Sequence, residues 1–261
     1  MSNESDGERR VAVAIGNTHV RAAICVNGEI SDRIVVETER ALAEPAALDP
    51  ILALSAQTED CRVVISSVVP TVLSALRSGL ECQSNVTALV VGSDIPLPMP
   101  MDVESPESVG VDRVCAAAAA FARVKQACVV VDFGTAITVN AVGDNGAFLG
   151  GAILPGLGLA ARALAEHTAA LPLVEVCKPG SVLGRTTEAA LTSGLFYGAR
   201  GAIREIVEAM AASFGKWPTL LFTGGDAVLV GEDCDFADVV VPDLGLLGLE
   251  LADRSHMEAD L

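Results

Sequence analysis

The sequence predicts an α/β fold made of two duplicated halves, and three observations carry this expectation. Two segments, 11–24 and 129–142, repeat one pattern: an apolar strand, a tight turn with glycine and small polar residues, and a second apolar strand. Strand-like and helix-like segments alternate along the rest of the chain. A chain of 261 residues that is 51% hydrophobic can also bury a sizeable core, as one large domain or two similar halves.

Short apolar runs predict the strands of the first half, and longer runs with helical spacing predict its helices. The expected elements are two strands within 11–24, a strand near 29–36, a helix around 41–54, a strand over 62–66, a helix from Pro70 and a strand over 86–91.

A proline-rich segment over 92–108 follows the last of these strands. Proline lacks the backbone N–H that a helix needs, so we expect a long, exposed and semi-rigid loop. The loop leads to the motif 110–113 and to an alanine-rich helix over about 111–124. Its prolines are Pro96, Pro98, Pro100 and Pro106.

The second half repeats the strand–turn–strand unit and then continues with further strands and helices. Its expected elements are the strand pair around Asp132, a segment over 146–154, a helix after Pro155 and Gly156, a long helix over about 187–212 and a strand over 219–222.

The charge balance excludes several classes of partner. The formal net charge is −17 and the pI is near 4.4, whereas non-specific binding to nucleic acid or to an anionic membrane needs a positive surface. Residues 1–10 are polar and lack the apolar core of a signal peptide, and the apolar runs are too short to span a membrane. We therefore expect a cytoplasmic protein that binds neither nucleic acid nor membrane.

Cysteine and histidine offer little chemistry in this chain. The seven cysteines are scattered and form no CxxC pair, so we expect buried or inert thiols. The three histidines, His19, His167 and His256, have no metal-ligand spacing. Acid–base chemistry must therefore rest on carboxylates.

The two repeated turns differ at one chemically important position. Aligning Gly16 with Gly134 sets Asn17 against Thr135 and Ala14 against Asp132, so only the second copy keeps its carboxylate. Glycine adds no Cβ and accepts a positive φ, which lets backbone N–H groups and a hydroxyl approach a phosphate. A single turn of this kind is usually an ordinary hairpin turn, but two of them facing each other suggest a nucleotide cleft.

Asp132 stands at the end of a fully apolar strand. An unpaired charge there costs several kcal/mol unless a cation or hydrogen-bond donors compensate it. We expect Asp132 to interact with a cation or a phosphate group.

The motif Gly110–Arg113 lies at the beginning of a predicted helix. Asp112 can accept a proton from a hydroxyl, and the adjacent Arg113 can steady a phosphoryl oxygen. The alternative is that Asp112 is a plain acidic residue interacting with the helix dipole.

A third glycine motif, Thr223-Gly224-Gly225, follows the last predicted strand. It fits a turn that packs against a flat ring such as adenine, although any strand-to-helix turn can carry two glycines.

Together, the motifs resemble those of the type III pantothenate kinases, in register over nearly the whole chain. That family belongs to the superfamily of acetate and sugar kinases, Hsp70 and actin, whose two ribonuclease-H-like halves close on ATP. The resemblance therefore implies an α/β fold with duplicated ribonuclease-H-like (actin-like ATPase) halves and mixed sheets flanked by helices. The matching motifs are Gly16–Thr18, Ile65–Pro70, Gly110–Arg113, Asp132–Thr135, Gly150–Gly156, and Thr187 before Ser193-Gly194.

The resemblance also implies an activity, namely ATP-dependent phosphorylation of pantothenate to 4'-phosphopantothenate, the first step of coenzyme A biosynthesis. The implied cofactors are Mg²⁺ and a monovalent cation, K⁺ or NH₄⁺, and the implied partner is a second copy of the chain in a homodimer.

Site roles carry over by position. Asp112 would be the general base, with Arg113 beside it, and Asp132 would bind the monovalent cation. The residues implied to bind ATP are Ala14, Ile15, Gly16, Asn17, Thr18, His19, Val20, Arg21, Thr135, Gly224 and Gly225, and those implied to bind pantothenate are Val103, Gly110, Val111, Asp112, Arg113 and Thr187.

The chain departs from the family pattern at three positions. The family's first loop reads Asp-x-Gly-Asn-Thr, but Ala14 stands at the acidic position, so the group expected to organise magnesium and phosphates is absent. Val103 stands where a tyrosine is frequent, and Thr186 where an asparagine is usual. Two alternatives therefore stay open: a degenerate paralogue that binds nucleotide or regulates a partner, and a superfamily kinase for another small alcohol.

The expected domain boundaries follow the duplication. They are a tail over 1–10, a first half over 11–118 with the phosphate loop, a second half over 119–252 and a tail over 253–261.

Overall fold

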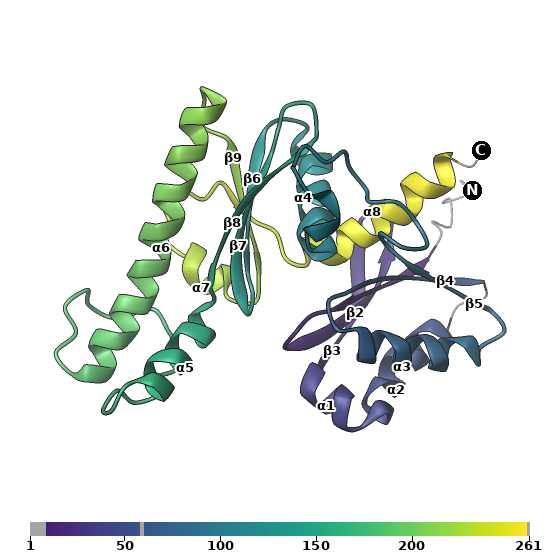
Figure 1. Ribbon diagram of the computed structural model, residues 1–261, viewed down its shortest axis with the longest axis horizontal. Coiled ribbons are helices and arrows are strands. Elements are labelled where there is room, and N and C mark those ends of the chain that lie inside the picture. Colours follow the sequence, from purple (N-terminus) through teal and green to yellow (C-terminus); the bar gives the residue numbers. More distant parts are fainter. Residues whose placement is uncertain (1–8, 58–59, 260–261) are drawn as a thin grey trace, which may run out of the picture. The chain divides into compact units, whose positions relative to one another are not determined.

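The computed structural model describes residues 9–57 and 60–259, and the chain forms two compact units. Unit 1 comprises the described residues of 1–100, 105–119 and 244–261, and unit 2 comprises 101–104 and 120–243 (Figure 1). No helix in the described part of the chain is long and apolar enough to cross a membrane.

Unit 1 is built on a mixed five-stranded sheet with the strand order β3-β2-β1-β4-β5. Its central strand β1 pairs antiparallel with β2 and parallel with β4. The strands are β1 (Arg10–Ile15), β2 (His19–Val26), β3 (Glu29–Glu37), β4 (Cys61–Ser67) and β5 (Val86–Val90).

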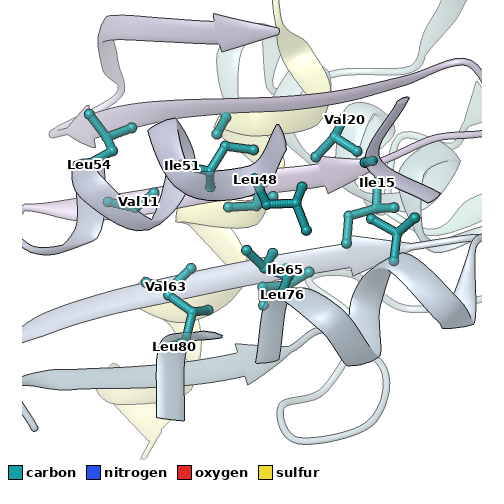
Figure 2. Close-up of a cluster of buried hydrophobic side chains, with 14 of the residues drawn as sticks. Val11, Ile15, Val20, Leu48, Ile51, Leu54, Val63, Ile65, Leu76 and Leu80 are labelled. Carbon is teal, nitrogen blue, oxygen red and sulfur yellow. The ribbon is translucent and has the colours of Figure 1, made fainter. Parts of the chain in front are cut away.

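Helices cover both faces of this sheet. Alternate residues of β1, such as Val11 and Ile15, pack under the helices α1, α2 and α3, as Figure 2 shows. The opposite face packs against the C-terminal helix α8 and the first turns of α4. The helices are α1 (Thr38–Ala43), α2 (Asp49–Ser55), α3 (Pro70–Glu81), α4 (Val111–Val124) and α8 (Leu244–Ala259).

The single helix expected around 41–54 is divided into two. Helix α1 ends before Glu44, whose backbone is extended, and a short 3-10 helix over Pro45–Leu48 leads into α2. Proline disfavours a helical conformation in the residue before it, so Pro45 forces the break.

Unit 2 has a second mixed sheet with the order β10-β9-β6-β7-β8, covered on one face by α5, α6 and α7. The elements are β6 (Cys128–Phe133), β7 (Ala136–Val142), β8 (Phe148–Pro155), α5 (Leu157–His167), α6 (Thr187–Phe214), β9 (Thr219–Gly224), α7 (Ala227–Gly231) and β10 (Val239–Val240).

The two sheets confirm the predicted duplication. Strand β6 pairs antiparallel with β7 and parallel with β9, as β1 does with β2 and β4. The first turn is one residue longer, because Ile15 pairs with Val20 whereas Phe133 pairs with Ile137. An alignment that sets Gly16 against Gly134 without a gap therefore pairs each residue of β2 with a residue of β7 that is one position away from its structural equivalent.

The C-terminal helix differs from its expected place in the second half and tail. Helix α8 packs on β1, β2 and β4 of unit 1. At Gly248 it passes so close to α4 that a Cβ would lie 2.0 Å from the carbonyl oxygen of Cys115. At the other end of the chain, Arg10 belongs to β1, and residues 1–8 lie outside the described part.

The segment 92–108 is irregular, as expected, but it is only partly exposed. Ile95 and Met99 are buried, and Pro106–Ser108 form one 3-10 turn. The apolar side chains between its prolines explain why it packs down on the fold.

A buried ion pair fastens α8 to the sheet of unit 1. Arg10 and Arg62 lie side by side on β1 and β4, and both donate hydrogen bonds to the fully buried carboxylate of Asp253, at 2.6 and 2.9 Å. Burial is the largest single influence and by itself would raise the pKa of Asp253, but the hydrogen bonds and positive charges of Arg62 and Arg10 together lower that pKa.

We expect Asp253→Asn to lower the free energy of unfolding by about 3 kcal/mol at neutral pH, because Arg10 and Arg62 then lose the fully buried anion that they share. The exposed pair of Glu44 with Arg40 supplies the control, and Glu44→Gln should cost less than about 1 kcal/mol. Urea denaturation followed by circular dichroism measures both variants.

The same measurement has a defined pH dependence. The folded-state pKa of Asp253 lies below its unfolded value of about 3.9, so its contribution is complete above that pH and is lost as the pH falls through the folded pKa. The stability gap between wild type and Asp253→Asn should narrow below about pH 4. If Asp253→Asn lowers the free energy of unfolding at neutral pH by no more than Glu44→Gln does, the buried ion pair does not stabilise the fold as assigned.

Candidate active site

The first turn joins β1 to β2 and is held from outside by the start of α1. The N–H of Gly16 donates to the carbonyl of His19 at 2.9 Å. Buried Thr38 donates its hydroxyl hydrogen to the carbonyl of Gly16 at 2.7 Å and its N–H to the carbonyl of Thr18 at 2.9 Å. Asn17 and Thr18 stay exposed at the tip. The turn is thus a fixed backbone loop with polar groups facing outward, which suits an anion.

The second turn, between β6 and β7, is tighter and is enclosed by two later segments. The N–H of Gly134 donates to the carbonyl of Ala136 at 3.2 Å, and the carbonyl of Thr135 accepts from the N–H of Gly156 at 3.0 Å. A Cβ on Gly156 would lie 2.2 Å from the carbonyl oxygen of Gly134. The glycine at 156 therefore lets the chain after β8 close against this turn, while Thr135 remains exposed.

Asp132 is seated against Gly224 at the end of β9. A Cβ on Gly224 would lie 2.4 Å from Oδ1 of Asp132 and 2.6 Å from the backbone N of Phe133, and its φ is +96°. Both the space and the backbone conformation therefore require glycine. Gly225 follows it in an exposed position, and the N–H of Asp226 donates to the carbonyl of Phe133.

Two hydroxyl residues flank Asp132 on its own face of the sheet. Asp132 pairs directly with Thr138 on β7 and with Thr223 on β9. Next along β7, fully buried Asn140 donates from its side-chain amide to the Thr138 hydroxyl at 2.9 Å. We call Thr138, Asp132 and Thr223 the polar row of unit 2. Thr138 and Asn140 were not among the residues predicted from the sequence.

The corresponding row in unit 1 has a different charge. Ala14 pairs with Arg21 on β2 and with Ser66 on β4. A cationic side chain therefore neighbours the position where unit 2 has its carboxylate.

Asp112 lies in the first turn of α4, and its carboxylate folds back over Gly110. A Cβ on Gly110 would lie 2.6 Å from Oδ1 of Asp112, and the N–H of Arg113 donates to the carbonyl of Gly110 at 3.1 Å. Asp112 is exposed. Burial lowers the pKa of the Arg113 guanidinium, and the negative charge of Asp112 opposes this shift. An exposed carboxylate beside a half-buried cation is available to a substrate hydroxyl.

The remaining predicted substrate residues lie in unit 2. Val103 packs beside Gly150 of β8, with a methyl group 3.7 Å from where a Cβ would be. Thr187 begins α6 and lines a cavity of about 420 Å³ between α5 and α6. Thr186 caps α6 by accepting from the N–H of Ala189 at 3.2 Å, a role that asparagine would also fill. The other residues lining the cavity are Leu164, Leu171, Ala190, Leu191, Gly194 and Leu195.

The donors around Asp132 fit a cation that completes its ligand shell from a bound phosphate. Within residues 9–57 and 60–259, no three histidine, cysteine or acidic side chains gather as a metal cage. The Asp132 carboxylate with the Thr223 hydroxyl oxygen beside it provides hard oxygen ligands, and phosphate oxygens can supply the others.

Most of the thiols are buried, as expected. Cys25, Cys61, Cys115 and Cys128 are buried and free, and burial raises the pKa of Cys128 to about 12. Cys82 and Cys177 are exposed.

Comparison with known proteins identifies the family. Residues 10–209 match the family model for type III pantothenate kinase. A type III pantothenate kinase from Dehalococcoides mccartyi (strain ATCC BAA-2266 / KCTC 15142 / 195) is 34% identical over 256 residues, covering 94% of this chain and 96% of the relative.

Solved structures share the fold at lower identity. A protein assigned to the Baf family of transcriptional activators from Campylobacter jejuni has a TM-score of 0.60 at 20% identity, over 96% of this chain and 100% of that one. A protein assigned as a 2-dehydro-3-deoxygalactonokinase from Sinorhizobium meliloti has a TM-score of 0.58 at 16% identity, over 94% and 96%. These likenesses confirm the predicted fold class. The family model and the Dehalococcoides mccartyi relative show that the chain belongs to the type III pantothenate kinase family.

Proposed function

We propose that this protein transfers the γ-phosphoryl group of ATP to the primary hydroxyl of pantothenate, forming 4'-phosphopantothenate and ADP in the first step of coenzyme A biosynthesis. The observation that carries the proposal is family membership over 10–209 together with the exposed carboxylate of Asp112 beside Arg113. We assign the protein to the cytoplasm, where ATP for such a reaction is available.

The chemistry assigned to unit 1 needs one base and one anion clamp. The substrate hydroxyl oxygen attacks the γ-phosphorus, the bond to the bridging oxygen breaks, and ADP leaves with that electron pair. Asp112 accepts the hydroxyl proton, and Arg113 steadies a phosphoryl oxygen. The turn between β1 and β2 offers its backbone N–H groups, with Arg21 close by, to the phosphates.

Unit 2 is assigned the remaining nucleotide contacts. Thr135 contacts the phosphates, and Gly224 with Gly225 packs against adenine. Asp132 holds the monovalent cation, K⁺ or NH₄⁺, which when bound neutralises phosphate charge alongside Mg²⁺. The fit of the donors around Asp132 supports this assignment.

Pantothenate is assigned to Gly110–Arg113, Val103 and Thr187, and the working form is assigned to a homodimer. The apolar cavity beside Thr187 and four exposed apolar side chains within 159–183 support a partner surface on this part of unit 2. These side chains are Leu159, Leu173, Val182 and Leu183.

We expect Asp112→Asn to reduce turnover of pantothenate about a hundredfold or more while leaving nucleotide binding intact, because the amide cannot take the proton. The assay follows 4'-phosphopantothenate with ATP, Mg²⁺ and K⁺ present. Asp49→Asn is the matched control, since Asp49 is also an acidic residue in a first helical turn of unit 1.

The two variants separate the base from the helix-dipole alternative. Equal, small effects of Asp112→Asn and Asp49→Asn would mean that Asp112 only stabilises its helix. Nucleotide binding without turnover in the wild type would favour the degenerate paralogue instead.

Asp132→Asn should abolish activation by K⁺ or NH₄⁺, because it removes the anionic ligand of the cation. Turnover is measured against K⁺ concentration with Na⁺ held as the compensating salt. Asp144→Asn, at the opposite end of the β6–β7 pair and bonded to Lys216, should keep the wild-type K⁺ response. An unchanged response in Asp132→Asn would move the cation elsewhere.

Gly224→Ala should reduce K⁺ activation as well, because the new methyl group displaces the Asp132 carboxylate. Gly215→Ala is the control, since Gly215 also has a positive φ but has nothing within 4 Å of a new Cβ. Gly215→Ala should lose about 1 kcal/mol of stability from backbone strain. Gly224→Ala should lose more, because its new Cβ also meets the backbone of Phe133, so the K⁺ response is compared for the folded protein. If the two variants respond equally to K⁺, the close contact between Gly224 and Asp132 does not contribute to K⁺ activation.

A further inference from the structure

The polar row of unit 2 contains a hydroxyl whose orientation is set from inside the protein. Asp132, Thr138 and Thr223 project from the face of the sheet opposite the cluster under α5, α6 and α7, since that cluster takes the alternate residues of each strand. Asp132 leans toward β9, because its Oδ1 lies against Gly224. Thr138 lies on the other side of Asp132, on β7.

Asn140 fixes which way the Thr138 hydroxyl points. The Asn140 side chain is fully buried, and its amide donates to the Thr138 oxygen at 2.9 Å. A hydroxyl that accepts from an amide must direct its own hydrogen elsewhere. In the described part of the chain, no side chain or carbonyl accepts that hydrogen. Thr138 thus presents an oriented donor beside Asp132.

We propose that Thr138 donates its hydroxyl hydrogen to a phosphoryl oxygen of the bound nucleotide, and that Asn140 is the positioning residue that holds the hydroxyl in this orientation. The inference rests on the proposed nucleotide-dependent function and adds a contact to it. A preset donor that meets an anion loses little freedom on binding, so its hydrogen bond contributes fully to affinity.

The test compares nucleotides with and without phosphates. Ligand-observed NMR titration, which also follows weak binding, gives the affinities of ADP and adenosine with Mg²⁺ and K⁺ present. Thr138→Val should weaken ADP binding about tenfold or more and leave adenosine binding unchanged, whereas Thr138→Ser should bind ADP nearly as the wild type does.

Thr219→Val is the matched control. Thr219 belongs to the same sheet, and its hydroxyl also accepts from a side-chain amide, that of Gln126 at 2.7 Å. It lies at the opposite end of β9 from Thr223, so ADP affinity should stay at the wild-type value.

Each other outcome overturns the inference. Equal ADP affinity in Thr138→Val and Thr219→Val would remove the contact while leaving the proposed function intact. Equal loss of ADP and adenosine, or no rescue by Thr138→Ser, would assign Thr138 to packing. A wild type that binds neither nucleotide would overturn the proposed function together with the inference.

Discussion

The pairing of the central strand in each sheet is the constraint on which the candidate site depends. Because β1 and β6 each have an antiparallel neighbour on one side and a parallel neighbour on the other, the last residues of each strand are flanked by two side chains on one face. Asp132 gains its hydroxyl neighbours in this way, although Thr223 is 91 positions further along the chain. The register of the strands, and not the local motif, assembles the row.

Glycine has a second use in this fold besides allowing tight turns. Each candidate carboxylate rests on a glycine: Asp112 over Gly110, two residues before it, and Asp132 against Gly224, on a different strand. A side chain at either glycine would displace the carboxylate. These two glycines therefore serve to place an acid, while Gly16 and Gly134 shape the turns themselves.

The sequence predicted the order of elements and the duplication well, because the periodicity of apolar residues and the positions of turn residues depend directly on local structure. It could not place α8, since nothing in 244–259 shows which sheet an apolar helix face will cover. Thr38 and Asn140 were missed for a related reason. Each is an ordinary polar residue in its own segment, and its role follows from one contact that the sequence does not reveal. Thr38 bonds to the carbonyl of Gly16, and Asn140 bonds to the hydroxyl of Thr138.

The duplication also explains how the chain can lack one acid and still suit an anionic ligand. In unit 2 the cation proposed at Asp132 would offset the charge of this carboxylate before phosphates approach it. In unit 1 the equivalent row has neutral Ala14, with Arg21 as its neighbour on β2 and Ser66 on β4. A carboxylate at position 14 would stand beside Arg21 and compete with a phosphate for it. Replacing that acid by alanine removes a possible ligand for magnesium, but it leaves the arginine available to phosphoryl oxygens, which it can bind in bidentate fashion.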